Sequence, residues 1–96
     1  MADVLIATAA EQDYTEALSW YARRSERAAR GFEAEFERVI NAIQASPRRF
    51  PLCDPSHRFC LMRRYPFQVI YRETSGQALI VAVAHAKRQP GYWRER

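Results

Sequence analysis

Candidate chemistry in this 96-residue sequence rests on one histidine and on arginines near the ends of predicted strands. His85 follows an apolar run, and histidine is the side chain that titrates near neutral pH, so it is a candidate general acid or base. It is equally the type of residue that forms a hydrogen bond at the end of a strand. The spacing identifies no partner for proton transfer, so the structural role of His85 is favoured.

The basic residues are almost all arginine, because only Lys87 among the fifteen is a lysine. Residues 1–49 carry a net charge of −1, whereas residues 50–96 carry +5. Guanidinium groups bind phosphate and carboxylate, so the C-terminal half predicts an anionic partner, either nucleic acid or an acidic protein. Codon usage in a GC-rich genome is the alternative explanation for the arginine content, but it does not explain the asymmetry between the halves.

The arginines that we expect to face such a partner lie at strand ends. Arg63 and Arg64 end one predicted strand, Arg72 ends the next, and Arg88 follows the last. Neighbouring strand residues point to opposite faces of a sheet, so only one of Arg63 and Arg64 is expected to face a given partner. For each arginine the alternative role is to keep a strand end soluble.

An aromatic pair, Tyr92 and Trp93, stands near the end of the sequence. Such rings are suited to stacking on nucleic-acid bases, although a C-terminal aromatic pair more often docks a tail onto the core. The sequence contains no phosphate-binding glycine loop, no HExxH and no GxSxG, which excludes the common nucleotide-binding and hydrolase classes.

Cys53, His57 and Cys60 resemble half of a zinc site. No second pair of ligands follows, and structural zinc takes four nitrogen or sulfur ligands. We therefore predict free thiols in a reducing compartment, with no metal and no cofactor.

The first half of the sequence predicts a strand and a helical hairpin that would position these residues. A β-branched run predicts a strand over residues 3–7, and Thr8 with Glu11 matches a capping box at the start of a helix. Apolar residues then recur at helical spacing through Tyr21. After a break near Ser25 a second amphipathic helix runs to Ser46, which precedes a proline.

The second half changes to strand periodicity. Residues 58–64, 67–73 and 77–85 are predicted strands, and 74–76 is a turn. The last strand is apolar on both faces, which predicts a central position, with Val81, Val83 and His85 on one face. The fold class is therefore α+β, in the order β-α-α-β-β-β, with the helical hairpin on one face of a small, mainly antiparallel sheet. The opposite face is expected to carry the function.

Length and composition indicate one domain over residues 1–96. The longest apolar run, residues 78–84, is far shorter than the about 20 residues of a membrane span. The N-terminus lacks the features of a signal peptide, so we expect a cytoplasmic protein without membrane contact.

Five stretches of the sequence together resemble the RelE/ParE superfamily of type II toxin–antitoxin toxins, also called plasmid stabilisation proteins. They are Ala17-Leu18-x-Trp20-Tyr21-Ala22, Phe32 with Phe36, Ile43-x3-Pro47-x2-Phe50-Pro51, Arg63-Arg64-Tyr65-Pro66-Phe67-x-Val69-Ile70-Tyr71-Arg72, and Val83-Ala84-His85-x2-Arg88-x-Pro90-x-Tyr92-Trp93-x2-Arg96. The match covers nearly the whole chain in order, and the last two stretches are the specific ones.

The resemblance implies a toxin that a cognate antitoxin neutralises, and it includes two activities. ParE-like members inhibit DNA gyrase without a nuclease site, and they resemble this chain better in the helices and the C-terminal ending. For this branch we predict that Arg64, Arg72 and Arg88 bind the target through their charge, together with Trp93.

RelE-like members are ribosome-dependent mRNA endonucleases, for which His85, Arg63 and Tyr92 would be the catalytic residues. The lysines typical of RelE are absent, so we favour the ParE-like branch. The further alternative is a non-toxic orphan of the same fold. The resemblance leaves open a homodimer or a toxin–antitoxin hetero-oligomer.

Overall fold

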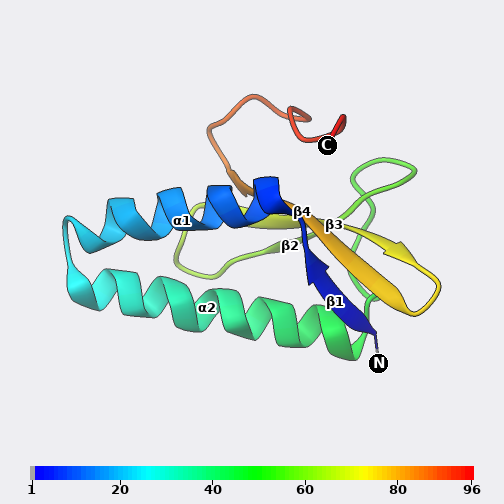
Figure 1. Ribbon diagram of the computed structural model, residues 1–96, viewed down its shortest axis with the longest axis horizontal. Coiled ribbons are helices and arrows are strands. Elements are labelled where there is room, and N and C mark those ends of the chain that lie inside the picture. The colour runs from blue at the N-terminus through cyan, green and yellow to red at the C-terminus, as the bar shows by residue number, and fades with distance from the viewer. Residues whose placement is uncertain (1) are drawn as a thin grey trace.

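The computed structural model describes residues 2–96. Its elements follow in the order β1 (Asp3–Ile6), α1 (Thr8–Ala22), α2 (Glu26–Ala45), β2 (Arg58–Leu61), β3 (Phe67–Thr74) and β4 (Gln77–His85). The predicted α+β order is confirmed. Figure 1 shows α1 and α2 side by side as an antiparallel hairpin, while the tail after β4 runs back past α1.

The strands form one sheet in the order β1-β4-β3-β2. The two pairs β2–β3 and β3–β4 are antiparallel, and β1 is parallel to β4. Strand β4 therefore lies inside the sheet between β1 and β3, which confirms the central position predicted from its apolar residues. Parallel neighbours need a connection of about a dozen residues or more. The helical hairpin supplies it, because it lies between β1 and the other strands in the sequence.

The two helices start differently. Helix α2 begins as predicted, because the Ser25 side chain accepts a hydrogen bond from the Ala28 N–H at 3.1 Å. The predicted capping box of α1 is wrong: its N-cap is Ala7, which offers no side-chain acceptor, and Thr8 is already helical. The start of α1 is held instead by the sheet, where the Ala7 N–H donates to the Ile80 carbonyl at 2.9 Å.

Strand β2 is shorter than the predicted range of 58–64, because the chain turns after Leu61. Arg64 has a φ of 68°, a left-handed conformation that interrupts strand geometry. Arg63 and Arg64 therefore lie in the turn that leads to β3 and do not end a strand. The expectation that their side chains point to opposite faces of the sheet therefore does not apply.

A bulge in β4 changes which of its residues share a face. Ile70 of β3 pairs with Ala82 and Tyr71 pairs with Ile80, so Val81 is an extra residue. Val83 packs into the cluster under the helices, whereas Val81 packs into the cluster on the opposite face. The prediction that Val81, Val83 and His85 share one face of the sheet is therefore wrong for Val81.

The main core lies between the helical hairpin and the sheet. Phe32, Val39 and Ile43 of α2 are fully buried there against Val69 and other strand residues. Burying a side chain of this size contributes about 1.5–3 kcal/mol relative to leaving it exposed. This layer fixes the hairpin on the sheet and sets the position of α1.

The opposite face of the sheet is not left open, contrary to the expectation from the sequence. Trp93 from the C-terminal tail is only 4% exposed and packs with Ile70, Ala82 and Ala84. Tyr92 packs against the edge of the same cluster. The tail therefore forms a second, smaller core. Within residues 2–96, neither helix has the length and apolar character needed to cross a membrane.

Candidate functional site

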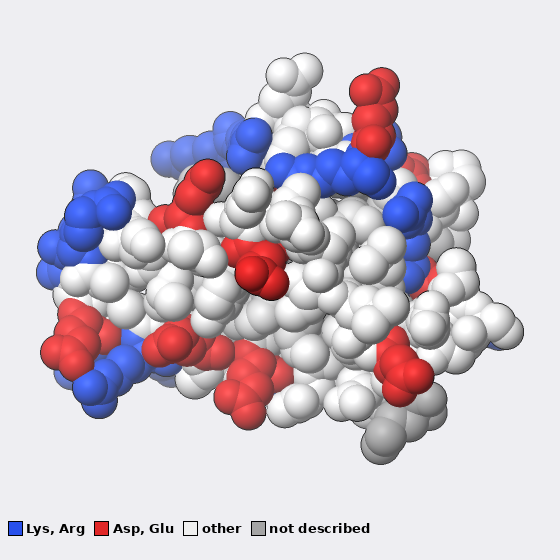
Figure 2. Space-filling view, in the orientation of Figure 1, with Lys and Arg blue, Asp and Glu red and all other residues white. Residues whose placement is uncertain are grey.

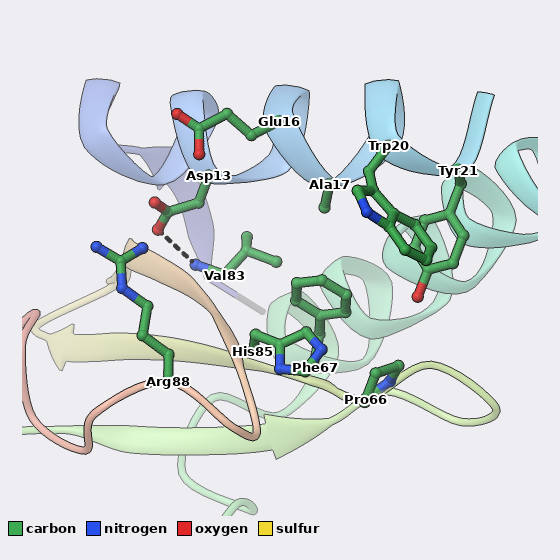
Figure 3. Close-up of a pocket in the computed structure, with 10 residues that line it drawn as sticks. All are labelled: Asp13, Glu16, Ala17, Trp20, Tyr21, Pro66, Phe67, Val83, His85 and Arg88. Carbon is green, nitrogen blue, oxygen red and sulfur yellow. Dashed lines mark hydrogen bonds between the residues drawn. The ribbon is translucent and has the colours of Figure 1, made fainter. Parts of the chain in front are cut away.

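A cavity of about 370 Å³ lies between α1 and the strand ends of β3 and β4. Figure 3 shows that α1 forms one wall while the segment at Pro66 and Phe67 and the end of β4 form the other. The lining residues are Asp13, Glu16, Ala17, Trp20, Tyr21, Pro66, Phe67, Val83, His85 and Arg88. We call this cavity the α1 pocket.

One end of the α1 pocket is aromatic. Trp20 is 46% exposed although it is large and apolar, and its ring meets Tyr21 edge-on at 5.1 Å. The Arg24 guanidinium lies 3.7 Å from the centre of the Trp20 ring. An exposed aromatic residue at the mouth of a hollow is typical of a surface that binds another protein.

The other end of the pocket is held by Asp13, which sequence analysis did not single out. Its carboxylate accepts hydrogen bonds from the Val83 N–H at 3.1 Å and from Arg96 Nη1 and Nη2 at 2.6 and 3.2 Å. Arg96 Nη1 also donates to the Val81 carbonyl, 3.1 Å away. One buried carboxylate thus ties α1 to β4 and to the tail. The sequence feature that could have indicated this role is the position of Asp13, an acidic residue on the otherwise apolar face of α1.

His85 lies at the pocket, where the structure gives it a local hydrogen bond. Its Nδ1 accepts from the Lys87 N–H at 3.0 Å, and its ring meets Phe67 edge-on at 5.0 Å. Since Nδ1 is an acceptor, the neutral ring carries its proton on Nε2. This is the strand-end hydrogen bond that the structural interpretation of His85 predicted.

Arg88 and Tyr92 are brought together beside the pocket. The Arg88 guanidinium lies 3.8 Å from the centre of the Tyr92 ring, and Figure 3 shows it pointing toward the Asp13 end of α1. The Tyr92 hydroxyl is buried and finds no hydrogen-bond partner within residues 2–96. Burial, followed by the nearby Asp13 carboxylate, raises the pKa of Tyr92.

The other predicted site residues lie elsewhere. Arg63 lines a separate cavity between α2 and β2, and Arg72 lines a third cavity, of about 460 Å³, with Arg58 and Glu73. Arg64 is exposed in the turn after β2. The α1 pocket therefore contains His85 and Arg88 of the seven predicted residues, with Tyr92 stacked on Arg88.

Trp93 is held by a second set of polar contacts, which fixes the tail from the other side. The His57 ring packs on it at 4.7 Å, and His57 Nδ1 lies 3.0 Å from Asp54 Oδ1. Arg94 Nε donates to Asp54 Oδ2 at 3.2 Å. Partial burial alone would raise the pKa of Asp54, but hydrogen bonds from the Ser56 and His57 N–H groups and the His57 ring lower it to about 2. The docked position of Trp93 is the alternative role given above for the aromatic pair, and target binding by Trp93 stays a prediction.

Charge is distributed unevenly over the face that carries the helices. Figure 2 shows acidic side chains spread across the helices, while basic side chains gather at the turn between α1 and α2 and along the C-terminal tail. The α1 pocket opens between these regions, with Glu16 on one side and Arg88 on the other. A partner that covers this pocket meets both signs of charge around an apolar centre.

Comparison with known proteins agrees with this architecture. A family described as "ParE toxin of type II toxin-antitoxin system, parDE" matches residues 4–90. A search of curated proteins found no match. A solved structure described as a chromosomal ParDE toxin–antitoxin system from P. aeruginosa superposes with a TM-score of 0.78 at 16% identity, covering 91% of this chain and 98% of that chain. The structural likeness shows a shared fold, and the family match runs from within β1 through β4 into the first part of the tail. The chain belongs to the ParE toxin family of type II toxin–antitoxin systems.

Proposed function

We propose that this ParE-family protein inhibits DNA gyrase by binding and without catalysis. We further propose that a cognate antitoxin neutralises it by inserting apolar side chains into the α1 pocket. The proposal places the protein in the cytoplasm, where gyrase acts on the chromosome. The family match over residues 4–90 supports the toxin class, and the exposed aromatic wall at Trp20 supports the docking position.

The observation that carries the non-catalytic proposal is the separation of the three RelE-type residues. Cleavage of RNA through its 2′-hydroxyl needs a base, an acid and a cation within hydrogen-bond reach of one phosphate. Here Arg63 lines the cavity between α2 and β2, His85 lines the α1 pocket, and the Tyr92 hydroxyl is buried. A buried phenol with a raised pKa is poorly suited to transfer a proton to substrate.

Ribosome-dependent mRNA cleavage is the second candidate, favoured by one observation. His85 and Arg88 line the same pocket, and Arg88 stacks on Tyr92, so a titratable group and a cation do lie together. Arginine stays protonated and stabilises phosphate charge, which leaves proton transfer to the histidine.

Two assays on the purified protein separate the candidates. Gyrase supercoiling, with a check for cleaved DNA complexes, is expected to be inhibited, and inhibition is expected to survive His85→Ala. Inhibition is expected to weaken when Arg64, Arg72 and Arg88 are replaced together, because these are the cations that we propose bind the target. Cleavage of mRNA on programmed ribosomes that is lost in both His85→Ala and Tyr92→Phe would overturn the proposal.

Expression in a bacterial host tests the toxin class and the antitoxin site. Growth arrest that is relieved by the neighbouring small reading frame supports a toxin, whereas normal growth at confirmed soluble expression supports the orphan. In the arrested host, Trp20→Ala is expected to weaken rescue by the antitoxin. The matched control is Leu5→Ala, because Leu5 is similarly exposed at 49% but lies on β1. Equal rescue of both variants would exclude the α1 pocket as the docking site.

A further inference from the structure

A second cavity, of about 290 Å³, opens between α2 and the outer strand β2. It is separate from the α1 pocket, with which it shares no lining residue. Its wall consists of three arginines and a set of mainly apolar residues: Arg38, Arg49 and Arg63 with Ala42, Phe50, Pro51, Phe59, Cys60 and Leu61. We call it the β2 cavity.

Only one of the three guanidinium groups has a carboxylate partner within residues 2–96. Arg38 Nε and Nη2 donate to the two oxygens of Glu35, each at 2.7 Å. The Arg63 N–H donates to the same carboxylate, and the hydrogen bond from Arg38 is the main reason why the pKa of Glu35 is lowered. Glu35 therefore holds Arg38 and the turn after β2 in place. The side chains of Arg49 and Arg63 form no ion pair with any described residue.

The three arginines line the same cavity as the buried thiol of Cys60. Cys60 is 5% exposed, and burial raises its pKa; the charge of Glu35 also raises it, while the charges of Arg38, Arg49 and Arg63 lower it. A segment that enters this cavity of about 290 Å³ therefore meets all three arginines. Three arginines that line one cavity, with a carboxylate partner for only one of them within residues 2–96, favour an anionic ligand.

The apolar part of the wall distinguishes between anionic ligands. Leu61 is 64% exposed, and Phe50 and Phe59 are partly exposed beside it. Protein–protein interfaces combine arginine and aromatic residues around an apolar centre, whereas surfaces that bind DNA are more polar and more positive throughout. Strand β2 is also an outer strand of the sheet, covered at its Arg58 end by the bridge from Leu52. These features favour a protein segment over a nucleic acid.

We propose that the β2 cavity binds an acidic segment of a partner protein, with its carboxylates on Arg49, Arg63 and the free edge of Arg38, and an apolar side chain against Leu61 and Phe50. The charge complementarity of three guanidinium groups with one internal carboxylate specifies the acidic class of the segment. This site is additional to the antitoxin position in the α1 pocket and does not depend on gyrase inhibition.

The test measures binding of defined probes to the intact protein. The probe is a short end-blocked peptide of Glu, Leu and Ser, the uncharged control has Gln in place of Glu, and an oligodeoxythymidine of equal length represents nucleic acid. Titration is followed by NMR of backbone amides and arginine Nε–H groups, and the affinity by fluorescence anisotropy. Because the assay contains neither antitoxin nor gyrase, its outcome is separate from that of the proposed function.

We expect the acidic peptide to shift the Leu61 and Arg63 resonances and the Gln peptide to leave them unchanged. Arg49→Gln and Arg63→Gln are each expected to lower the affinity about tenfold, the size of one charge-assisted hydrogen bond. Both residues are exposed, so these variants are expected to fold. The matched control is Arg27→Gln, an exposed arginine on α2 outside the cavity.

Three results would overturn the proposal. The first is no binding of the acidic peptide. The second is an equal loss of affinity in Arg27→Gln, which would indicate diffuse attraction to the net charge. The third is tighter binding of the oligodeoxythymidine to the same residues, which would assign the cavity to nucleic acid.

Discussion

Replacing Asp13 by alanine removes a carboxylate that hydrogen-bonds from α1 to both β4 and the C-terminal tail. Two groups lose their acceptor in this variant: the Val83 N–H and the Arg96 guanidinium. Both are poorly placed to find water, because the side chain of Asp13 is 8% exposed and that of Arg96 is 22% exposed. The structure therefore predicts a loss of stability well above that of a surface substitution.

The magnitude follows from what remains after the change. Removing one partner of a buried ion pair destabilises by about 3–5 kcal/mol. Arg96 keeps its hydrogen bond to the Val81 carbonyl and some contact with solvent, so we expect about 2–3 kcal/mol for Asp13→Ala. In a domain of this size about 1 kcal/mol shifts Tm by about 4–8 °C, so the expected drop is about 10–20 °C. Asp13→Asn keeps an oxygen for the Val83 N–H, and we expect about half the loss.

Urea unfolding followed by circular dichroism measures these differences. The control is Glu37→Ala, which removes a carboxylate from an exposed position on α2 and is expected to stay within about 0.5 kcal/mol of the parent. A double-mutant cycle with Arg96→Gln isolates the ion pair, whose coupling we expect to be about 1–2 kcal/mol. The reasoning is refuted if Asp13→Ala behaves like the Glu37 control, or if the asparagine variant is as unstable as the alanine variant.

Three other substitutions test the packing, the acid stability and the turn. Gly31→Ala places a Cβ in steric conflict with the Tyr65 hydroxyl oxygen, so we expect a lower Tm and, by NMR, a displaced Tyr65 ring; an unchanged ring position would contradict the close approach. The Asp54 carboxyl has a folded pKa of about 2, below its unfolded value, so its contribution to stability is present above about pH 4 and is lost as the pH falls through 2. Asp54→Asn should therefore flatten the acid branch of a stability–pH profile, and an unchanged slope would show that another group controls it. Glycine adopts the positive φ of Arg64 without strain, so we expect the Tm of Arg64→Gly to equal or exceed that of Arg64→Ala. A lower Tm for the glycine variant would exclude backbone strain at this residue.

The local sequence pattern was sufficient to predict the bounds of most helices and strands. Both helices, β3 and β4 lie within one residue or two of their predicted ranges, because each buries one continuous apolar face and ends at a strong local signal. Ser25 caps α2 and Pro47 follows its end, and both signals act within a few residues of chain. The central position of β4 also followed from its own residues, since a strand that is apolar on both faces needs cover on both.

Prediction from the local sequence pattern failed where a contact with a distant segment determines the structure. Thr8 and Glu11 match a capping box, but the Ala7 N–H pairs with Ile80 on the sheet, and the helix starts one residue earlier than the box requires. Residues 62–64 have strand composition, yet the turn that brings β3 alongside β2 needs a left-handed residue there. The bulge at Val81 moves that side chain to the opposite face without any mark in the sequence.

The candidate sites depended almost wholly on the tertiary structure. Asp13 and Arg96 are separated by nearly the whole sequence, and only the return of the tail past α1 makes them partners. The sequence did specify its set of chemical groups: a single lysine, a basic C-terminal half and an aromatic pair before the end. Which of those groups face solvent and which are buried was decided by the fold, because spacing along a chain says nothing about contacts between distant segments. Trp93 is buried and Arg49 and Arg63 share one cavity for that reason.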